Sequence, residues 1–106
     1  MEVTTRVLNL VITDENQKHI DMKCAAFGKR FVDAVMMNLE INRDRHHRKG
    51  VIIRMRATLS LCTKGSALIH GESEEETFVR ALDEIFTALK RQLERLKAHP
   101  RVRPNE

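Results

Sequence analysis

The clearest pattern in this sequence is the alternation of apolar and polar residues over residues 51–61, which is typical of a strand with one buried face. Residues 31–41 alternate in the same way, and their apolar face is interrupted only by Asp33. The β-branched run at residues 2–8 predicts a first strand, and residues 67–70 predict a last, short one. The inward positions of the two long strands are Phe31, Val35, Met37, Leu39, Ile41, Val51, Ile53, Met55, Ala57, Leu59 and Leu61.

Two other segments have helical spacing. Thr13, followed by Asp14 and Glu15, predicts a capped helix start, and Gly28 predicts the end of that helix. Ser73, with Glu76 three residues later, has the form of a capping box and predicts the start of a long second helix that Pro100 ends. The expected buried stripes are Ile20, Cys24 and Phe27 on the first helix, and Phe78, Leu82, Ile85, Leu89, Leu93 and Leu96, flanked by Val79 and Phe86, on the second.

The order of elements is therefore β-α-β-β-β-α, an α+β fold. The first helix connects two parallel strands, and short connections at residues 42–50 and 63–65 make the remaining strands antiparallel. We expect a four-stranded mixed sheet with both helices on one face, and Arg54 and Arg56 on the open face. Residues 1–99 are predicted to form a single domain, and residues 100–106 a polar tail.

The distribution of charge is more informative than the total. The chain has 106 residues, and 19 Lys and Arg against 15 Asp and Glu give a net charge of only +4. Residues 72–84 carry six acids and one base, whereas residues 87–103 carry six bases and one acid. Acids suit the start of a helix and bases its end, but six bases exceed what the helix dipole needs. The excess indicates a site for a polyanion, with phosphates as the natural candidate.

Other chemistries find little support. His46 and His47 are adjacent in a predicted loop, so they do not converge on one metal centre, and no metal or other cofactor is expected. Cys24 and Cys62 are isolated and are expected to be ordinary core residues of a protein in a reducing compartment. No catalytic constellation, phosphate-cradling glycine motif or apolar run of membrane-spanning length is present, so we expect no enzyme, no small-molecule substrate and no membrane contact, and a cytoplasmic location.

The basic residues of both helices form the candidate site. Arg91 and Arg95 are neighbours on the outer face of the second helix. Lys90 and Lys97 flank the apolar stripe of the same helix on one side. Lys29 and Arg30 close the first helix, after Lys23. If the helices lie side by side, these residues could merge into one positive surface. The alternative is a solubilising face of ordinary ion pairs, such as Glu94 with Lys90.

The segment ALDEIFTALKRQLERL at residues 81–96 resembles the closing helix of the short ribosome hibernation factors, also called ribosome-associated inhibitors or sigma-54 modulation proteins. Ile12-Thr13, His19-Ile20 and Gly71 also match, and the similarity extends over residues 3–97. The resemblance implies a fold similar to a double-stranded-RNA-binding domain with one added strand. It also implies a protein that binds the small ribosomal subunit under stress or in stationary phase.

The same resemblance implies a site. Family members lie in the channel used by mRNA and tRNA and contact rRNA through basic residues of both helices. Lys23, Lys29, Arg91 and Arg95 match basic positions of the family, whereas Arg30, Lys90 and Lys97 are candidates from the charge pattern alone.

Three functions remain open from the sequence. The first is a translation inhibitor that acts by occupying the small-subunit channel, with small-subunit rRNA as partner and a monomeric state off the ribosome. The second is a general module for structured RNA. The third is a protein-interaction domain, for instance a regulator of transcription, that uses the acidic start of the second helix.

Overall fold

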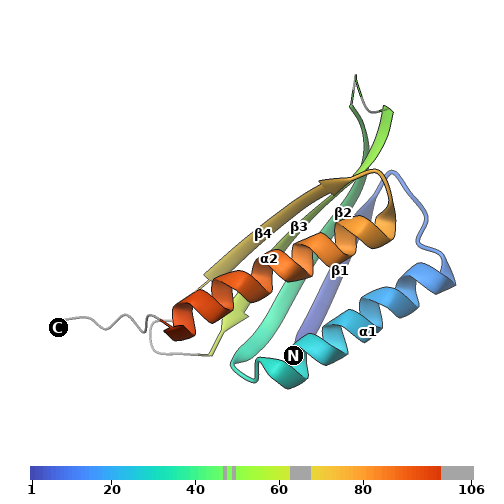
Figure 1. Cartoon of the computed structure of the whole chain (residues 1–106). Helices are drawn as coiled ribbons and strands as arrows, with labels where there is room; N and C mark the ends of the chain where they lie inside the picture. Colours follow the sequence, from blue (N-terminus) through green and yellow to red (C-terminus); the bar gives the residue numbers. More distant parts are fainter. Residues whose placement is uncertain (47, 49, 63–67, 99–106) are drawn as a thin grey trace.

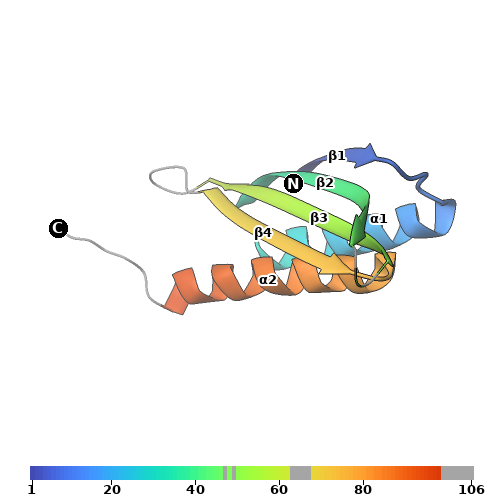
Figure 2. The ribbon, with the colours of Figure 1, turned by 90° about the horizontal axis from the view of Figure 1, so that it is seen from above.

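The fold is a four-stranded sheet with two helices on one of its faces (Figures 1 and 2). The computed structural model describes residues 1–46, 48, 50–62 and 68–98. The strands lie in the order β1-β2-β3-β4, with β1 parallel to β2 and the other neighbours antiparallel. The elements are β1 (Glu2–Leu8), α1 (Asp14–Arg30), β2 (Ala34–His46), β3 (Gly50–Leu61), β4 (Leu68–Glu75) and α2 (Phe78–Ala98). The predicted α+β order and layer arrangement are confirmed.

The core lies between the sheet and the helices. Every second residue of β2 and β3 points toward the helices, and the apolar stripes of α1 and α2 cover these side chains. Many of the residues predicted to be inward are buried, among them Ile20, Phe27, Ile53, Met55, Phe78, Leu82, Ile85 and Leu89. On α2, Leu96 and Val79 are the exceptions along the predicted stripe and its flank, at 42% and 41% exposed. On β3, the predicted inward residue Val51 is 49% exposed.

Helix α1 begins as predicted but ends later. The Thr13 side chain accepts a hydrogen bond from the backbone N–H of Asn16, so Thr13 is the cap. Gly28 does not end the helix, which continues to Arg30. Phe31 then caps it by donating its N–H to the carbonyl of Phe27 at 2.9 Å. Because Phe27 and Phe31 are both buried, the apolar stripe continues past the glycine and the helix continues with it.

The boundary between β4 and α2 differs most from the prediction. Ser73 and Glu76 do not form a capping box, because β4 runs to Glu75 and α2 begins only at Phe78. Thr77 takes the capping role, and its hydroxyl accepts from the N–H of Arg80 at 3.3 Å. Ser73 is buried in β4, where its hydroxyl donates to the carbonyl of Ala81 at 2.7 Å. The acids of residues 72–76 therefore belong to the strand and the turn that follows it, and the first turn of α2 has none.

The strands β2 and β3 are longer at their shared hairpin than predicted. The segment at residues 42–50 is largely strand rather than a turn, because β2 continues to His46 and β3 begins at Gly50. At the other end of β2 the pairing shifts between Ala34 and Met36. The shift buries Ala34 and leaves Val35 44% exposed, which reverses the predicted facing of these two residues.

Some predictions fall outside the described residues or concern single side chains. The hairpin connection at 63–65, the helix end at Pro100 and the tail at 100–106 all lie outside the described residues. The prediction for Cys62 was wrong, since this residue is exposed, while Cys24 is half-buried against the core. Across the part of the chain that is described, no helix is long and apolar enough to span a membrane.

Candidate nucleic-acid interface

Helices α1 and α2 lie side by side and form a groove between them. This inter-helix groove, of about 310 Å³, is lined on its rim by Lys23 and Arg30 from α1 and by Lys90 from α2. Residues 23, 26, 27 and 30 follow helical spacing, which is why α1 presents its basic residues and Phe27 to the same groove.

The floor of the inter-helix groove is aromatic. The ring centroids of Phe27 and Phe31 are 4.8 Å apart, and Phe86 meets Phe27 edge-on at 5.5 Å. The guanidinium carbon of Arg30 lies 5.4 Å from the centre of the Phe31 ring. Packing of this kind fixes the two helices against each other and holds the stem of Arg30 in place.

Two ion pairs cross the inter-helix groove. Lys23 Nζ lies 2.7 Å from Asp83 Oδ1, and Arg30 pairs with Glu94. All four side chains are about half exposed, with values between 40% and 55%, so each pair adds little to stability and remains open to exchange. Within the described residues, Lys90 has no carboxylate partner and Glu94 pairs with Arg30, not with Lys90.

Arg91 and Arg95 lie on a different flank of α2. They follow Lys90 by one and five residues, which corresponds to rotations of about 100° and 140° around the helix axis. Between them, Gln92 donates a hydrogen bond to the carbonyl of His70 on β4 at 2.6 Å, which places this flank beside the sheet edge. Both arginines are exposed, as predicted, and in the described part of the chain neither has a carboxylate partner.

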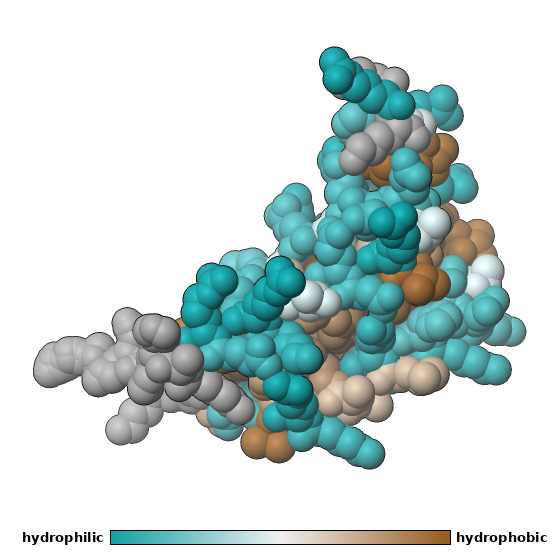
Figure 3. Space-filling view, in the orientation of Figure 1, coloured by the Kyte–Doolittle hydropathy of each residue, from teal (hydrophilic) through white to brown (hydrophobic). Residues whose placement is uncertain are grey.

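The predicted basic residues therefore form two groups rather than one merged surface. The structure brings Lys23, Arg30 and Lys90 together at the inter-helix groove and places Arg91 and Arg95 on the outer flank of α2. Lys29 is exposed near the end of α1 and does not line the groove. The backbone of Lys97 belongs to α2, and its side chain lies outside the described residues. In Figure 3, hydrophilic side chains cover most of the side of the molecule that carries both helices.

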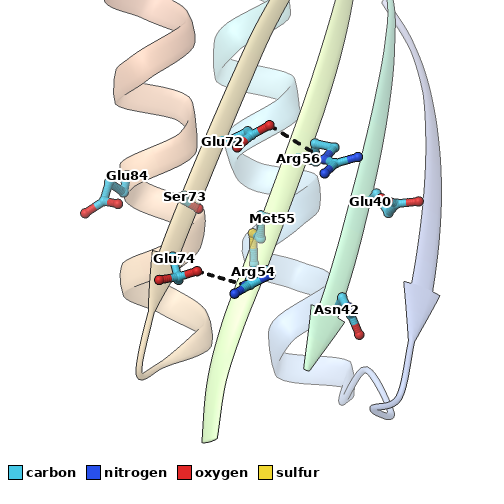
Figure 4. A pocket seen from close by; sticks show the side chains of 9 residues that line it. All are labelled: Glu40, Asn42, Arg54, Met55, Arg56, Glu72, Ser73, Glu74 and Glu84. Atoms are coloured by element: carbon cyan, nitrogen blue, oxygen red, sulfur yellow. Dashed lines mark ion pairs between the residues drawn. The ribbon is translucent and has the colours of Figure 1, made fainter. Parts of the chain in front are cut away.

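The open face of the sheet carries charges that compensate one another. Arg54 Nε lies 2.8 Å from Glu74 Oε2, and its Nη1 lies 3.4 Å from Asp44 Oδ2. Figure 4 shows the Arg54–Glu74 and Arg56–Glu72 pairs crossing from β3 to β4, above a shallow hollow of about 540 Å³. Arg6 adds a weaker pair with Glu40, at 3.8 Å. Because each arginine has an acidic neighbour, this face is less suited to a polyanion than the helix side.

The titratable groups show no catalytic arrangement among the described residues, where no group of three metal-ligating side chains occurs. Burial, together with the nearby Asp21, raises the pKa of the Cys24 thiol to about 11. This thiol is therefore protonated at neutral pH and acts as a core side chain.

Comparison with known proteins identifies the family. The family model described as sigma 54 modulation protein / S30EA ribosomal protein matches residues 2–101. The chain belongs to this family. It is a family of ribosome-associated modulation proteins and not a known enzyme family. Among curated proteins, the sequence has no match.

Solved structures share the fold. A ribosomal subunit interface protein from Coxiella burnetii superposes with a TM-score of 0.77 at 14% identity, covering 92% of this chain and 99% of that one. The N-terminal domain of Thermus thermophilus Protein Y superposes with a TM-score of 0.66 at 22% identity, covering 91% of this chain and 99% of that one. At these identities the likeness supports the architecture of this family member and nothing finer.

Proposed function

We propose that this family member binds the small ribosomal subunit in stressed or stationary-phase cells and inhibits translation by occupying the channel for mRNA and tRNA. The observation that carries the proposal is the family match over residues 2–101, on a chain whose helix side presents exposed basic residues. The mechanism requires no chemistry. A basic domain seated on rRNA phosphates would exclude the ligands that need the same space.

The composition of the helix side supports a contact with phosphates rather than bases. The chain has four Phe and no Trp or Tyr, and Phe27, Phe31, Phe78 and Phe86 are all buried. No Phe, Tyr or Trp ring is therefore available for base stacking. Exposed cations remain as the binding groups, and cations recognise the phosphate backbone without reading sequence.

The ion pairs of the inter-helix groove are compatible with this role. In the free protein, Lys23 forms an ion pair with Asp83, and Arg30 forms one with Glu94. Because half-exposed pairs contribute only about 0–1 kcal/mol, an rRNA phosphate could share or replace the carboxylate at small cost. Lys90, Arg91 and Arg95 carry no such pair within the described residues and are the first cations we expect to contact RNA.

The proposal also covers location and assembly. The protein would act in the cytoplasm, where ribosomes translate, and would be a monomer when off the ribosome. Its rRNA contact would be made by the basic residues of α1 and α2, with Lys23, Lys29, Arg91 and Arg95 at the basic family positions.

The test is binding to purified small ribosomal subunits as a function of salt. Arg91→Ala/Arg95→Ala should weaken binding, and the slope of log affinity against log salt should become shallower by about 0.7–0.9 for each phosphate that the variant no longer binds. Arg6→Ala/Arg56→Ala removes the same net charge from the open sheet face and is the matched control. Arg80→Ala, near the start of α2, should also matter little.

Both double variants should fold normally, because all four arginines are exposed. If Arg91→Ala/Arg95→Ala binds as tightly as wild type while its circular dichroism is unchanged, the outer flank of α2 is not the rRNA contact. Equal weakening by both double variants would indicate that only the overall charge matters.

A further inference from the structure

The hairpin of β2 and β3 extends beyond the rest of the sheet. β1 pairs with β2 only as far as Asn42, and β4 pairs with β3 only as far as Ile53. The pairs from Asp44 with Ile52 to His46 with Gly50 therefore form a ribbon of two strands alone. Figure 1 shows this ribbon projecting past the start of α2. Gly50, at a φ of +80°, occupies the left-handed conformation at its tip.

Positive charge is concentrated on this projecting ribbon. Arg43, Arg45 and Arg48 are all exposed, and none of them has a carboxylate partner among the described residues. Asp44 is the only acidic residue between residues 42 and 50, and both of its carboxylate oxygens already have partners. Its Oδ2 lies 3.4 Å from Arg54 Nη1, and its Oδ1 accepts from the N–H of Arg45 at 2.8 Å.

The alternation of β2 separates these charges onto two faces. Met37, Leu39 and Ile41 point toward the helices, so Arg43 and Arg45 continue the same face, while Asp44 lies on the opposite one. Arg43 confirms this placement, because it lines a groove beside Asn16 of α1 and Phe78 of α2. The ribbon thus presents Arg43 and Arg45 on the helix side of the molecule and Asp44 on the compensated open face.

The ribbon is also distant from the other basic groups. It lies beyond the start of α2, whereas Arg91 and Arg95 lie near the other end of that helix. Phe78, the first residue of α2, and Arg91 are already 13 residues apart, which corresponds to about 20 Å along the helix axis. A single phosphate cannot contact both groups. Two contacts on one side of the molecule would span a long stretch of RNA.

We propose that the β2–β3 ribbon is a second phosphate-binding surface, through which Arg43, Arg45 and Arg48 contact the RNA backbone at a point separate from the helices. This inference rests on the proposed function, since it adds a contact with the same rRNA. A two-stranded ribbon is narrow, and it can present its arginines to the phosphates that border the wide, shallow minor groove of an A-form RNA helix. Its base is anchored in the sheet, so the ribbon need not be ordered by binding, which favours affinity.

The test compares Arg43→Gln/Arg45→Gln with Arg6→Gln/Arg56→Gln, in binding to purified small ribosomal subunits. All four arginines are exposed and lie on strands, and each double substitution removes two positive charges. The ribbon variant should bind about ten-fold or more weaker near 0.1 M salt, with a slope shallower by about 1.4–1.8, whereas the control should change little. Because the ribbon and the outer flank of α2 are far apart, the loss of binding free energy in the ribbon variant should add to the loss in Arg91→Ala/Arg95→Ala.

Chemical footprinting of the rRNA then locates the contact. The ribbon variant, at a saturating concentration, should lose one protected stretch of nucleotides that the helix variant and the control retain. Weaker binding without any change in the rRNA footprint would assign the ribbon to a ribosomal protein and overturn the proposal. Unchanged binding would also overturn it, while leaving the proposed function intact. If wild-type protein failed to bind small subunits at all, the proposed function itself would be wrong.

Discussion

Gly71 shows how a single residue controls the packing of α2 on the sheet. It is buried in β4, and a Cβ built on it would lie 3.0 Å from Leu89 Cδ2 and 3.2 Å from Leu89 Cγ. The helix therefore approaches the strand closely because this position has no side chain. Conformational freedom is not the reason, since Gly71 does not have the positive φ seen at Gly50.

Replacing Gly71 should be destabilising. Gly71→Ala forces Leu89 to move, and overpacking of this kind costs about 1–3 kcal/mol of unfolding free energy, with Gly71→Val costing more. Gly28→Ala is the matched control, because its Cβ would meet only Met1 Cβ at an ordinary 3.7 Å. Within a helix that substitution should stabilise by about 0.5–1 kcal/mol. Urea unfolding measures both, and equal effects would contradict the close approach at Gly71.

A second residue, Glu84 on α2, makes a contribution to the free energy of unfolding that depends on pH. A side-chain hydrogen bond with Glu75 raises the pKa of Glu84, and desolvation and the negative charge of Glu75 act in the same direction. A raised carboxyl pKa means that the folded protein holds the proton more tightly than the unfolded chain. The ionised group therefore opposes folding at neutral pH, and this effect disappears as the pH falls through the range where Glu84 is protonated.

Glu84→Gln should consequently raise the melting temperature at pH 7. The gain should shrink toward zero as the pH falls below the ordinary Glu pKa of about 4.3, because the folded and the unfolded wild-type chain then both hold the proton. Thermal unfolding followed by circular dichroism at several pH values tests this, with Glu76→Gln as the control for net charge. A gain that grows as the pH falls would have the wrong sign and would contradict the Glu75–Glu84 interaction.

At the scale of the elements, α2 contributes most of the core on its side of the sheet. Leu89 is fully buried, so Leu89→Ala should reduce the unfolding free energy by about 2–5 kcal/mol. Leu96 lies on the same stripe but is 42% exposed near the helix end, so Leu96→Ala should cost less than about 1 kcal/mol. Chemical denaturation of the two variants checks this. If the two variants lost similar amounts of unfolding free energy, Leu96 would be as buried as Leu89, which would contradict this structure.

The sequence predicted the order and type of the elements but misplaced the ends of α1, β2 and β4 and the starts of β3 and α2. β4 was expected to stop at residue 70, because its later inward positions, Gly71 and Ser73, are small or polar rather than apolar. Close packing of α2 over β4 requires small residues there, so an apolar pattern cannot reveal the strand. Likewise, Arg43 and Arg45 continue β2 where no core lies beneath them, and alternation of hydrophobicity is absent.

The exposure of the candidate basic residues could be predicted from the sequence, but their arrangement could not. Helical spacing placed Arg91 and Arg95 on an outer face, and the structure agrees. The pairs of Lys23 with Asp83 and Arg30 with Glu94 depend on how α1 and α2 slide along each other. That packing is a tertiary property, so no local pattern could have indicated which basic residues share a groove.

For the whole molecule, charge follows the architecture. Within the described residues, the helix side carries cations without acidic partners at Lys90, Arg91 and Arg95, while the arginines of the open sheet face are paired with acids. The resulting polarity gives the domain one side suited to phosphates. Such a one-sided charge distribution suits the proposed inhibition by occupancy, which requires the domain to sit on rRNA in a defined orientation.

The proposed function requires the protein to associate with ribosomes when translation is shut down. Its most direct test is the sedimentation profile of the endogenous protein in sucrose gradients of lysates from growing and from starved cells. We predict that starvation moves the protein into fractions containing the small subunit, and that raising the salt releases it. If it stays at the top of the gradient in both conditions at low salt, the proposed function is wrong.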